Sequence, residues 1–197
     1  MCENLPEAQE ILPDSATMAE SQEREQGKKR YRKTLITTLL VLAASVAAAL
    51  LLATVWMPVL QIYGKSMDPT LVGGEIVVAI KTKRIEAGDV IAFDLNNKLL
   101  IKRVIGTEGD KIHVAEDGTV YVNDEELNEP YLTEKHSGGP NVAMPYEVTE
   151  GTYFVMGDNR EKSVDSRHST VGCVTEEQLI GKAVLRIWPI SRFGLVK

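Results

Sequence analysis

One serine in this chain lies in a segment that cannot form the interior of a helix. Ser66 follows Gly64, which frees the backbone just before it. Pro69 fixes its own φ angle and pushes Asp68 towards an extended conformation. A hydroxyl held on a fixed, non-helical backbone is a candidate nucleophile. Because most loop serines do no chemistry, the alternative interpretation is a plain connecting loop.

A lysine lies between apolar neighbours further along the chain. The two-residue period of a strand places Leu100, Lys102 and Val104 on one face. Apolar surroundings disfavour the charged amine, so the pKa of Lys102 should fall below its free value of about 10.4. A neutral amine can take a proton from a serine hydroxyl, and Ser–Lys pairs are an established variant of the serine triad. The alternative is an edge-strand lysine whose charged end reaches water.

Residues 156–167 form a second cluster, dense in turn formers, hydroxyls and opposite charges. Such a loop can hold a neighbouring amine by hydrogen bonds and brace itself by ion pairs, or it can be a solvated surface loop. Two other motifs do not fit. A phosphate-binding P-loop ending at Ser66 would need a glycine where Val59 stands. A Ser-His-Asp triad using His113 or His168 lacks the G-x-S-x-G sequence around any serine.

The composition limits the class of protein. The 197 residues suit one domain with an accessory segment, and the net charge of -6 argues against a nucleic-acid partner. The two cysteines, Cys2 and Cys173, stand at opposite ends of the chain, so no disulfide framework is expected. The three histidines show no ligand spacing, and the sequence therefore predicts neither a metal site nor a cofactor.

A long apolar stretch precedes the candidate nucleophile. No charged residue occurs from Thr34 to Gly64, and the core from Leu35 to Met57, at ~1.5 Å per residue, is ~34 Å long, enough to cross a membrane. Basic residues from Lys28 to Lys33 predict a cytoplasmic N-terminus. A cleaved secretory signal is the alternative, although the apolar core is long for one. We therefore expect a disordered tail (1–33), a transmembrane helix (34–58) and an extracytoplasmic domain (59–197).

The remainder of the chain has the pattern of a mainly β domain. Short β-rich runs between turn residues predict strands over 75–80, 90–93, 99–105, 111–114, 119–122, 152–156 and 182–188. Asn96-Asn97 and Asp117-Gly118 predict turns between strands. Residues 176–179 predict a short helical turn, and 128–147, rich in glycine and proline, a long loop. Many short strands favour a small sandwich or barrel-like sheet.

Four stretches, taken together and in order, resemble the bacterial type I signal peptidases. These are membrane-anchored serine proteases with a β-rich catalytic domain, which remove signal peptides from exported proteins. The stretches are 66–71 for the nucleophile, 88–93 as a structural box, 102–110 for the general base, and 157–167 as a closing box. Position 102 carries lysine, where the related endoplasmic-reticulum type uses histidine.

The resemblance implies a role for each matched residue. Ser66 would attack the scissile carbonyl, and neutral Lys102 would act as the general base. The backbone N–H of Ser66 would contribute to an oxyanion hole, and Ser163 would orient Lys102 by a hydrogen bond. The second oxyanion donor is open, because Gly64 replaces a serine that some members carry. Two ion pairs would brace the closing loop: Arg103–Asp158 and Arg167–Asp165.

The resemblance also implies the partners, which are signal peptides of exported preproteins and the lipid bilayer. An extended peptide could add to a sheet edge, with Met67 and Leu100 lining pockets for small residues such as alanine before the cut. The spacer 168–171 is longer than in many relatives and is interpreted as a surface insertion. Two other readings remain: a self-cleaving Ser–Lys peptidase of the repressor type, and a tethered β domain that binds exported peptides without cutting them.

Overall fold

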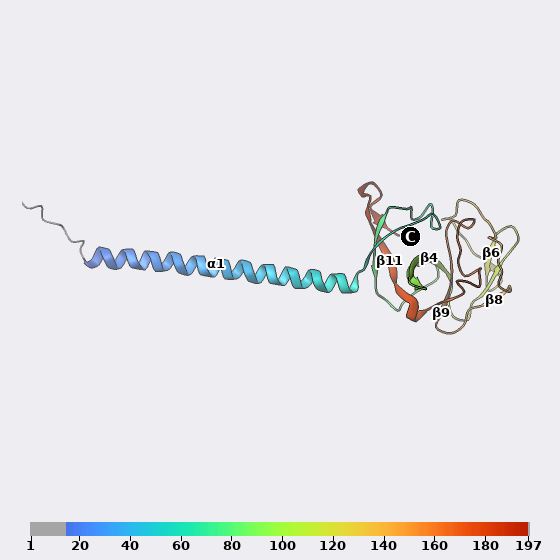
Figure 1. Cartoon of the computed structure of the whole chain (residues 1–197), viewed down its shortest axis with the longest axis horizontal. Helices are drawn as coiled ribbons and strands as arrows, with labels where there is room; N and C mark the ends of the chain where they lie inside the picture. The colour runs from blue at the N-terminus through green and yellow to red at the C-terminus, as the bar shows by residue number, and fades with distance from the viewer. Residues whose placement is uncertain (1–14, 197) are drawn as a thin grey trace, which may run out of the picture. The chain divides into compact units, whose positions relative to one another are not determined.

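The structure is a computed structural model that describes residues 15–196. The chain divides into two compact units, one ending at Leu52 and the other beginning at Ala53. One long helix, α1 (Ser15–Trp56), starts in the first unit and ends shortly before Pro58 (Figure 1). Proline cannot continue a helix and restricts the residue before it, which explains the end point.

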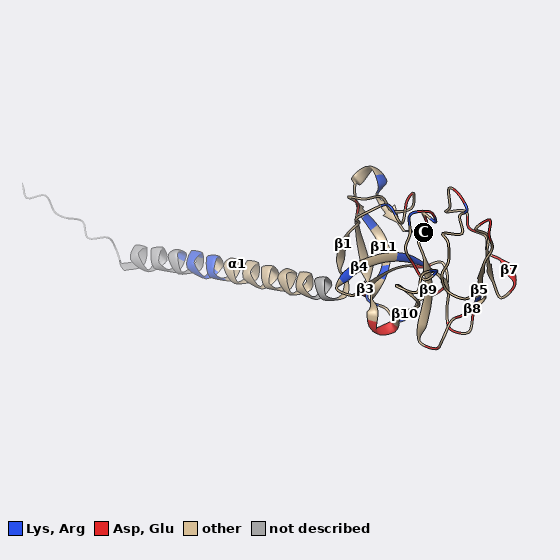
Figure 2. Cartoon of the chain, turned by 45° about the vertical axis from the view of Figure 1, so that its right-hand side comes forward, with Lys and Arg blue, Asp and Glu red and all other residues tan. Residues whose placement is uncertain are grey.

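The middle of α1 has the properties of a membrane span. Its segment Lys28–Leu51 is long and apolar enough to cross a bilayer, by length and composition. In Figure 2 the Lys and Arg positions, coloured blue, lie at the start of this segment, and the part beyond them carries none. The helix begins at Ser15, so residues 15–33, expected as part of a disordered tail, are helical. Their Glu, Gln, Lys, Arg and Ala are good helix formers, and extending an existing helix is easier than nucleating one. Residues 1–14 of the predicted tail lie outside the described residues.

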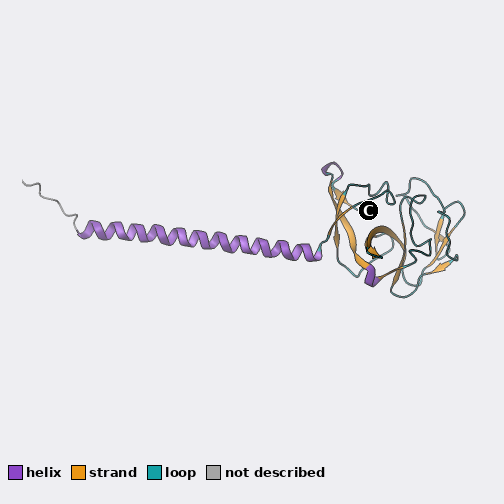
Figure 3. Ribbon diagram, viewed as in Figure 1, coloured by secondary structure: helices purple, strands orange, loops and turns teal. Residues whose placement is uncertain are grey.

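The second unit is mainly β, as the sequence predicts (Figure 3). Its larger sheet is antiparallel and has eight strands. Across the sheet the order is β1 (Val59–Gln61), β2 (Ile76–Ile80), β11 (Leu179–Trp188), β3 (Val90–Leu95), β4 (Lys98–Gly106), β9 (Thr152–Met156) and β10 (Val174–Thr175), with β12 (Gly194–Leu195) paired to β11. Short 3₁₀ turns, Glu176–Gln178 and Ile190–Arg192, lie before and after β11.

A smaller sheet is built from the chain between β4 and β9. Its strands, in spatial order, are β7 (Glu125–Glu126), β6 (Val120–Val122), β5 (Lys111–Val114) and β8 (Tyr146–Glu147). The core between the two sheets contains Ile105 and Phe154 from the larger sheet and Ile112 from the smaller one. The seven predicted strands are all present. Strands of two or three residues, such as β7 and β12, were not predicted because they are too short to show a period.

Strand β4 carries the predicted lysine into the interior of the second unit. A two-residue turn at Asn96 and Asn97, with φ angles of 53° and 63°, joins it to β3. The sequence predicts this turn from the Asn-Asn pair. This turn sets the register that places Lys102 opposite Ile91. From Ile101 to Gly106 the strand is buried on both faces, so that even its charged side chains lie in the interior.

Candidate active site

The structure brings Ser66 and Lys102 together. Ser66 lies in a tight turn that is closed by a hydrogen bond from Asp68 N to Lys65 O, 3.3 Å long, and a second bond from Leu71 N to Met67 O at 2.9 Å closes the turn that follows. The Nζ atom of Lys102, on β4, lies 2.7 Å from the Oγ atom of Ser66. Lys102 is only 3% exposed. The two groups are 36 residues apart in sequence and meet at hydrogen-bond distance without any rearrangement.

Burial sets the protonation behaviour of Lys102. Desolvation is the largest influence and lowers the pKa of this amine from 10.5 to about 8. The negative charge of Asp165 opposes the effect, and the guanidinium of Arg167 adds to it. A substantial fraction of Lys102 is therefore neutral just above neutral pH. A neutral amine at 2.7 Å from a hydroxyl has the geometry and the basicity of a general base.

The loop after β9 holds the backbone of Ser66 in place. The N–H of Asn159 donates to the carbonyl oxygen of Ser66 at 3.0 Å. Gly157 makes this approach possible, because a Cβ atom there would collide with the Ser66 carbonyl and with the side chain of Ser163. The N–H of Gly157 in turn donates to Asp165 at 3.0 Å. The loop and the turn that carries Ser66 are thus joined through backbone groups.

Two buried ion pairs brace this loop. Arg103 donates from Nε and Nη2 to the two carboxylate oxygens of Asp158, at 2.8 and 2.7 Å. Arg167 binds Asp165 in the same two-pronged manner, at 2.8 and 2.9 Å. All four side chains are at most 2% exposed. Bidentate pairing with hydrogen-bonded carboxylates is what makes charge tolerable in an interior.

Asp165 stays ionised in spite of its burial. Desolvation alone would raise its pKa, but the hydrogen bonds and charge of Arg167 outweigh that effect, and the pKa lies below the usual range. Asp165 is therefore a fixed negative charge. It is the strongest charge acting to raise the pKa of Lys102, which explains why the amine is not depressed further.

Ser163 does not make the hydrogen bond that the resemblance implies. Its Oγ atom is buried and has no hydrogen-bond partner among the residues that the structure describes. The Nζ of Lys102 is oriented by Ser66 instead. Ser163 packs against Gly157, whose neighbour in the site is the Ser66 carbonyl, so its predicted orienting role stays a prediction.

An apolar pocket of about 540 Å³ opens beside the two groups. Residues 59–67 form one wall and residues 98–102 of β4 form the other, with Ser66 and Lys102 among them. Met67 and Leu100, the residues expected to contact substrate, both line it. The volume falls within the range of ~300–1,000 Å³ that ligand sites have. We call this cavity the apolar pocket.

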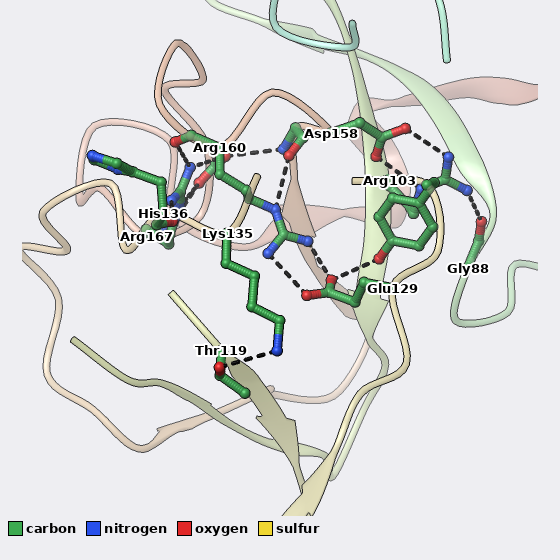
Figure 4. Close-up of polar contacts among 12 residues, drawn as sticks. Gly88, Arg103, Thr119, Glu129, Lys135, His136, Asp158, Arg160 and Arg167 are labelled. Atoms are coloured by element: carbon green, nitrogen blue, oxygen red, sulfur yellow. Dashed lines mark hydrogen bonds and ion pairs between the residues drawn. The ribbon is translucent and has the colours of Figure 1, made fainter. Parts of the chain in front are cut away.

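The sequence did not reveal a third ion pair behind the site. Arg160 donates from Nη1 to Glu129 at 3.2 Å, and its Nη2 lies closer still to the same carboxylate (Figure 4). Tyr131 donates its hydroxyl to Glu129 at 2.7 Å and places its ring 4.0 Å below the Arg103 guanidinium. Arg160 then donates from Nε to the carbonyl of Gly157 at 3.0 Å. In the sequence, this ion pair is indicated only by Glu129, Pro130 and Tyr131, which lie in a segment interpreted as a loop.

A fourth group of contacts supports the residues that follow Ser66. Arg186 donates to the carbonyl of Thr70 at 2.8 Å, and Arg192 to the carbonyl of Pro69 at 3.0 Å. Both arginines also pair with Glu75, which is 3% exposed. These residues come from distant parts of the chain and carry no common motif, so only the fold reveals them. Among the described residues no group of acids, histidines or cysteines could hold a metal ion.

Comparisons with known proteins show which family the chain resembles. Residues 33–188 match the family model described as "Signal peptidase, peptidase S26". Signal peptidase IB of Staphylococcus aureus (strain COL) is 41% identical over 152 residues, which cover 67% of this chain and 78% of that protein. Signal peptidase I of Bacillus licheniformis is 35% identical over 164 residues, covering 77% and 87% respectively.

A solved structure is also similar. The crystal structure of a signal peptidase I from Enterococcus faecalis V583 is 32% identical, with a TM-score of 0.41, and the match covers 52% of this chain and 98% of that one. The family model spans most of the chain and contains Ser66, Lys102 and the whole closing loop. The chain therefore belongs to the signal peptidase family, peptidase S26, and with it to the serine peptidases.

Proposed function

We propose that this protein is a membrane-anchored endopeptidase that removes signal peptides from exported preproteins, with Ser66 as nucleophile and neutral Lys102 as general base. The observation that carries the proposal is the distance of 2.7 Å between Lys102 Nζ and Ser66 Oγ, in a position where the amine is buried. Family membership supports the reaction class and the class of substrate.

Acylation would begin with proton transfer. Lys102 Nζ takes the proton of the Ser66 hydroxyl while Oγ bonds to the carbonyl carbon of the scissile peptide. The resulting oxyanion would be stabilised by the backbone N–H of Ser66. The Lys102 ammonium then returns its proton to the departing nitrogen, the C–N bond breaks, and the mature protein leaves with a free α-amine. An acyl ester of Ser66 remains.

Deacylation would repeat the sequence with water. Lys102, neutral again, takes a proton from a water molecule, whose oxygen attacks the ester carbonyl. The proton passes to Ser66 Oγ as the ester bond breaks, and the signal peptide leaves as a carboxylic acid. The base is neutral before each of the two steps, which suits an amine whose pKa is lowered to about 8.

The apolar pocket supports a preference for small side chains before the cut. An extended peptide would lie between its two walls, residues 59–67 and 98–102, with Met67 and Leu100 limiting the size of the side chains admitted. We propose cleavage after sequences of the Ala-X-Ala type. Segment Lys28–Leu51 would anchor the enzyme, with the N-terminus cytoplasmic and the catalytic domain outside.

Substitution of the two groups tests the proposal. We expect Ser66→Ala and Lys102→Met each to lower cleavage of a preprotein ending its signal in Ala-X-Ala by at least ~10³-fold, because each removes a reacting atom. Mass spectrometry before and after incubation with the full-length enzyme in detergent reads out the cut. Ser169→Ala and Lys111→Met, at exposed positions away from the apolar pocket, serve as matched controls. Full activity in either site variant would refute the dyad, and binding without any cleavage by the wild type would favour a peptide-binding module.

A further inference from the structure

A second cavity borders the turn at residues 65–71, which carries Ser66 and is called the nucleophile turn below. This cavity has no role in the proposed reaction. It measures about 360 Å³, within the range of ligand sites. We call it the polar pocket. Three segments line it: Asp68 and Pro69 of the nucleophile turn, Thr133, Glu134 and His136 of the long loop, and residues 158–162 of the closing loop.

The two pockets border consecutive residues of the chain just after Ser66. The lining of the apolar pocket on this turn ends at Met67, and the lining of the polar pocket begins at Asp68. No residue lines both cavities. Asn159, in the wall of the polar pocket, donates its N–H to the carbonyl of Ser66 itself. Ser66 therefore lines the apolar pocket, while its carbonyl is held by a residue of the polar pocket.

An endopeptidase binds chain on both sides of the bond that it cuts. If the apolar pocket takes the small residues before the cut, the chain after the cut leaves Ser66 on the side of the polar pocket. We propose that the polar pocket receives the first residues of the mature protein, and that it favours those with a positive charge. This inference rests on the proposed function and adds a second specificity site to it.

The charge of the pocket follows from which of its groups are already paired. Asp158 is neutralised by Arg103, and Arg160 by Glu129 (Figure 4). Among the described residues, the remaining acidic side chains of the pocket form no ion pair. They outnumber the basic side chains of the pocket that form none. The unpaired acids are Asp68, Glu134 and Glu161, and the unpaired base is Lys162. His136 uses its Nδ1 atom to accept a hydrogen bond from Gly138 N at 2.9 Å.

Asp68 gives the pocket a specific acceptor next to the reaction centre. Its Oδ1 atom is buried and has no hydrogen-bond partner among the described residues. A buried acceptor without a donor is costly, and a charged donor is the partner that compensates it best. Asp68 stands two residues after the nucleophile, so the donor would come from a residue close to the new N-terminus. A lysine or arginine side chain has the required chemistry.

Three matched substrates test the inference. They share one signal ending in Ala-X-Ala and differ only in the first two residues after the cut, which are both Lys, both Gln or both Glu. With the full-length enzyme in detergent at low salt, we expect kcat/KM to fall in the order Lys, Gln, Glu, by roughly fivefold between the extremes. High salt should compress the range, because exposed charges are screened.

Variants assign the effect to the pocket. The double substitution Glu134→Gln with Glu161→Gln should leave cleavage of the Gln substrate unchanged and remove most of the difference between Lys and Glu. Asp68→Asn should also reduce the difference in kcat/KM between the Lys and the Glu substrates. Glu150→Gln, exposed and outside the pocket, is the control and should change nothing. Equal kcat/KM for the three substrates, or a range that the double variant leaves intact, would overturn the inference alone. If no substrate is cleaved at all, the proposed function fails and this inference fails with it.

Discussion

Lys102 and Arg103 are neighbours on β4, are buried to 3% and 2% exposure, and meet opposite surroundings. Lys102 faces a hydroxyl and apolar side chains, and burial lowers its pKa to about 8. Arg103 faces the Asp158 carboxylate, the carbonyl of Gly88 and the ring of Tyr131. Strand β4 thus carries Lys102, whose surroundings favour the neutral form, next to Arg103, whose surroundings stabilise the charged form.

The difference shows how the molecule separates chemistry from support. A guanidinium cannot lose its proton, so a buried arginine must be paired, and its planar fork suits a carboxylate. An amine can lose its proton, so leaving it without a carboxylate partner converts burial into basicity. The ion-paired side of the site fixes the loop, and the unpaired side is the one that we propose to react. Substitutions on each side test that division, beginning with the largest expected effect on stability.

Arg103→Met should destabilise the fold strongly. It leaves the Asp158 carboxylate buried without a partner, and breaking a buried pair in this way costs about 3–5 kcal/mol. Urea unfolding of the full-length chain in detergent, followed by near-ultraviolet circular dichroism, measures it. Arg84→Met is the matched control, because the Arg84–Glu86 pair is 88% and 65% exposed and such pairs contribute at most about 1 kcal/mol. The double variant with Asp158→Leu should recover much of the loss. Equal effects at 84 and 103 would contradict the account.

Lys102→Met should do the opposite and stabilise the fold while abolishing activity. At pH 7 the amine is mostly charged in both the folded and the unfolded chain, and the difference between pKa values of 10.5 and about 8 corresponds to a net cost of about 3 kcal/mol for the charged amine in the fold. Loss of the hydrogen bond to Ser66 offsets about 1 kcal/mol, which leaves a gain of about 2 kcal/mol.

The gain should depend on pH with a definite sign. Between pH 8 and 10.5 the unfolded chain binds a proton that folded Lys102 has released, so the wild type becomes more stable as pH rises. The advantage of Lys102→Met should therefore shrink across this window in the same urea measurements. A destabilised variant at pH 7, or an advantage independent of pH, would mean that the amine is not held in an unfavourable environment.

Tyr131→Phe should have a smaller effect. It keeps the ring against Arg103 and removes only the hydroxyl that donates to Glu129. A single hydrogen bond of this kind contributes about 0.5–1.5 kcal/mol, with the upper end expected because its acceptor is charged and buried. The pH profile of cleavage should be unchanged, since Tyr131 does not contact Lys102. A shift of that profile would show that the two sides of the site are not separate.

The sequence predicts one side of this comparison better than the other. The apolar neighbours of Lys102 indicate its burial directly, and strand periodicity together with the family resemblance brings Ser66 to it. The pairing of Arg103 with Asp158 follows from the resemblance alone. Glu129 was not foreseen, because its partner Arg160 lies 31 residues away across a segment without any period. The position of the Ser163 side chain depends on packing against Gly157, which no sequence pattern describes.

The pH dependence of cleavage tests the central claim most directly. For the full-length enzyme acting on an Ala-X-Ala substrate, kcat/KM should rise about tenfold per pH unit at low pH and level off above a pKa of about 8, because the neutral form of Lys102 is the active one. A rise that continues to the free lysine value of about 10.4, or one governed by a group near 6.5 as for a histidine, would contradict it.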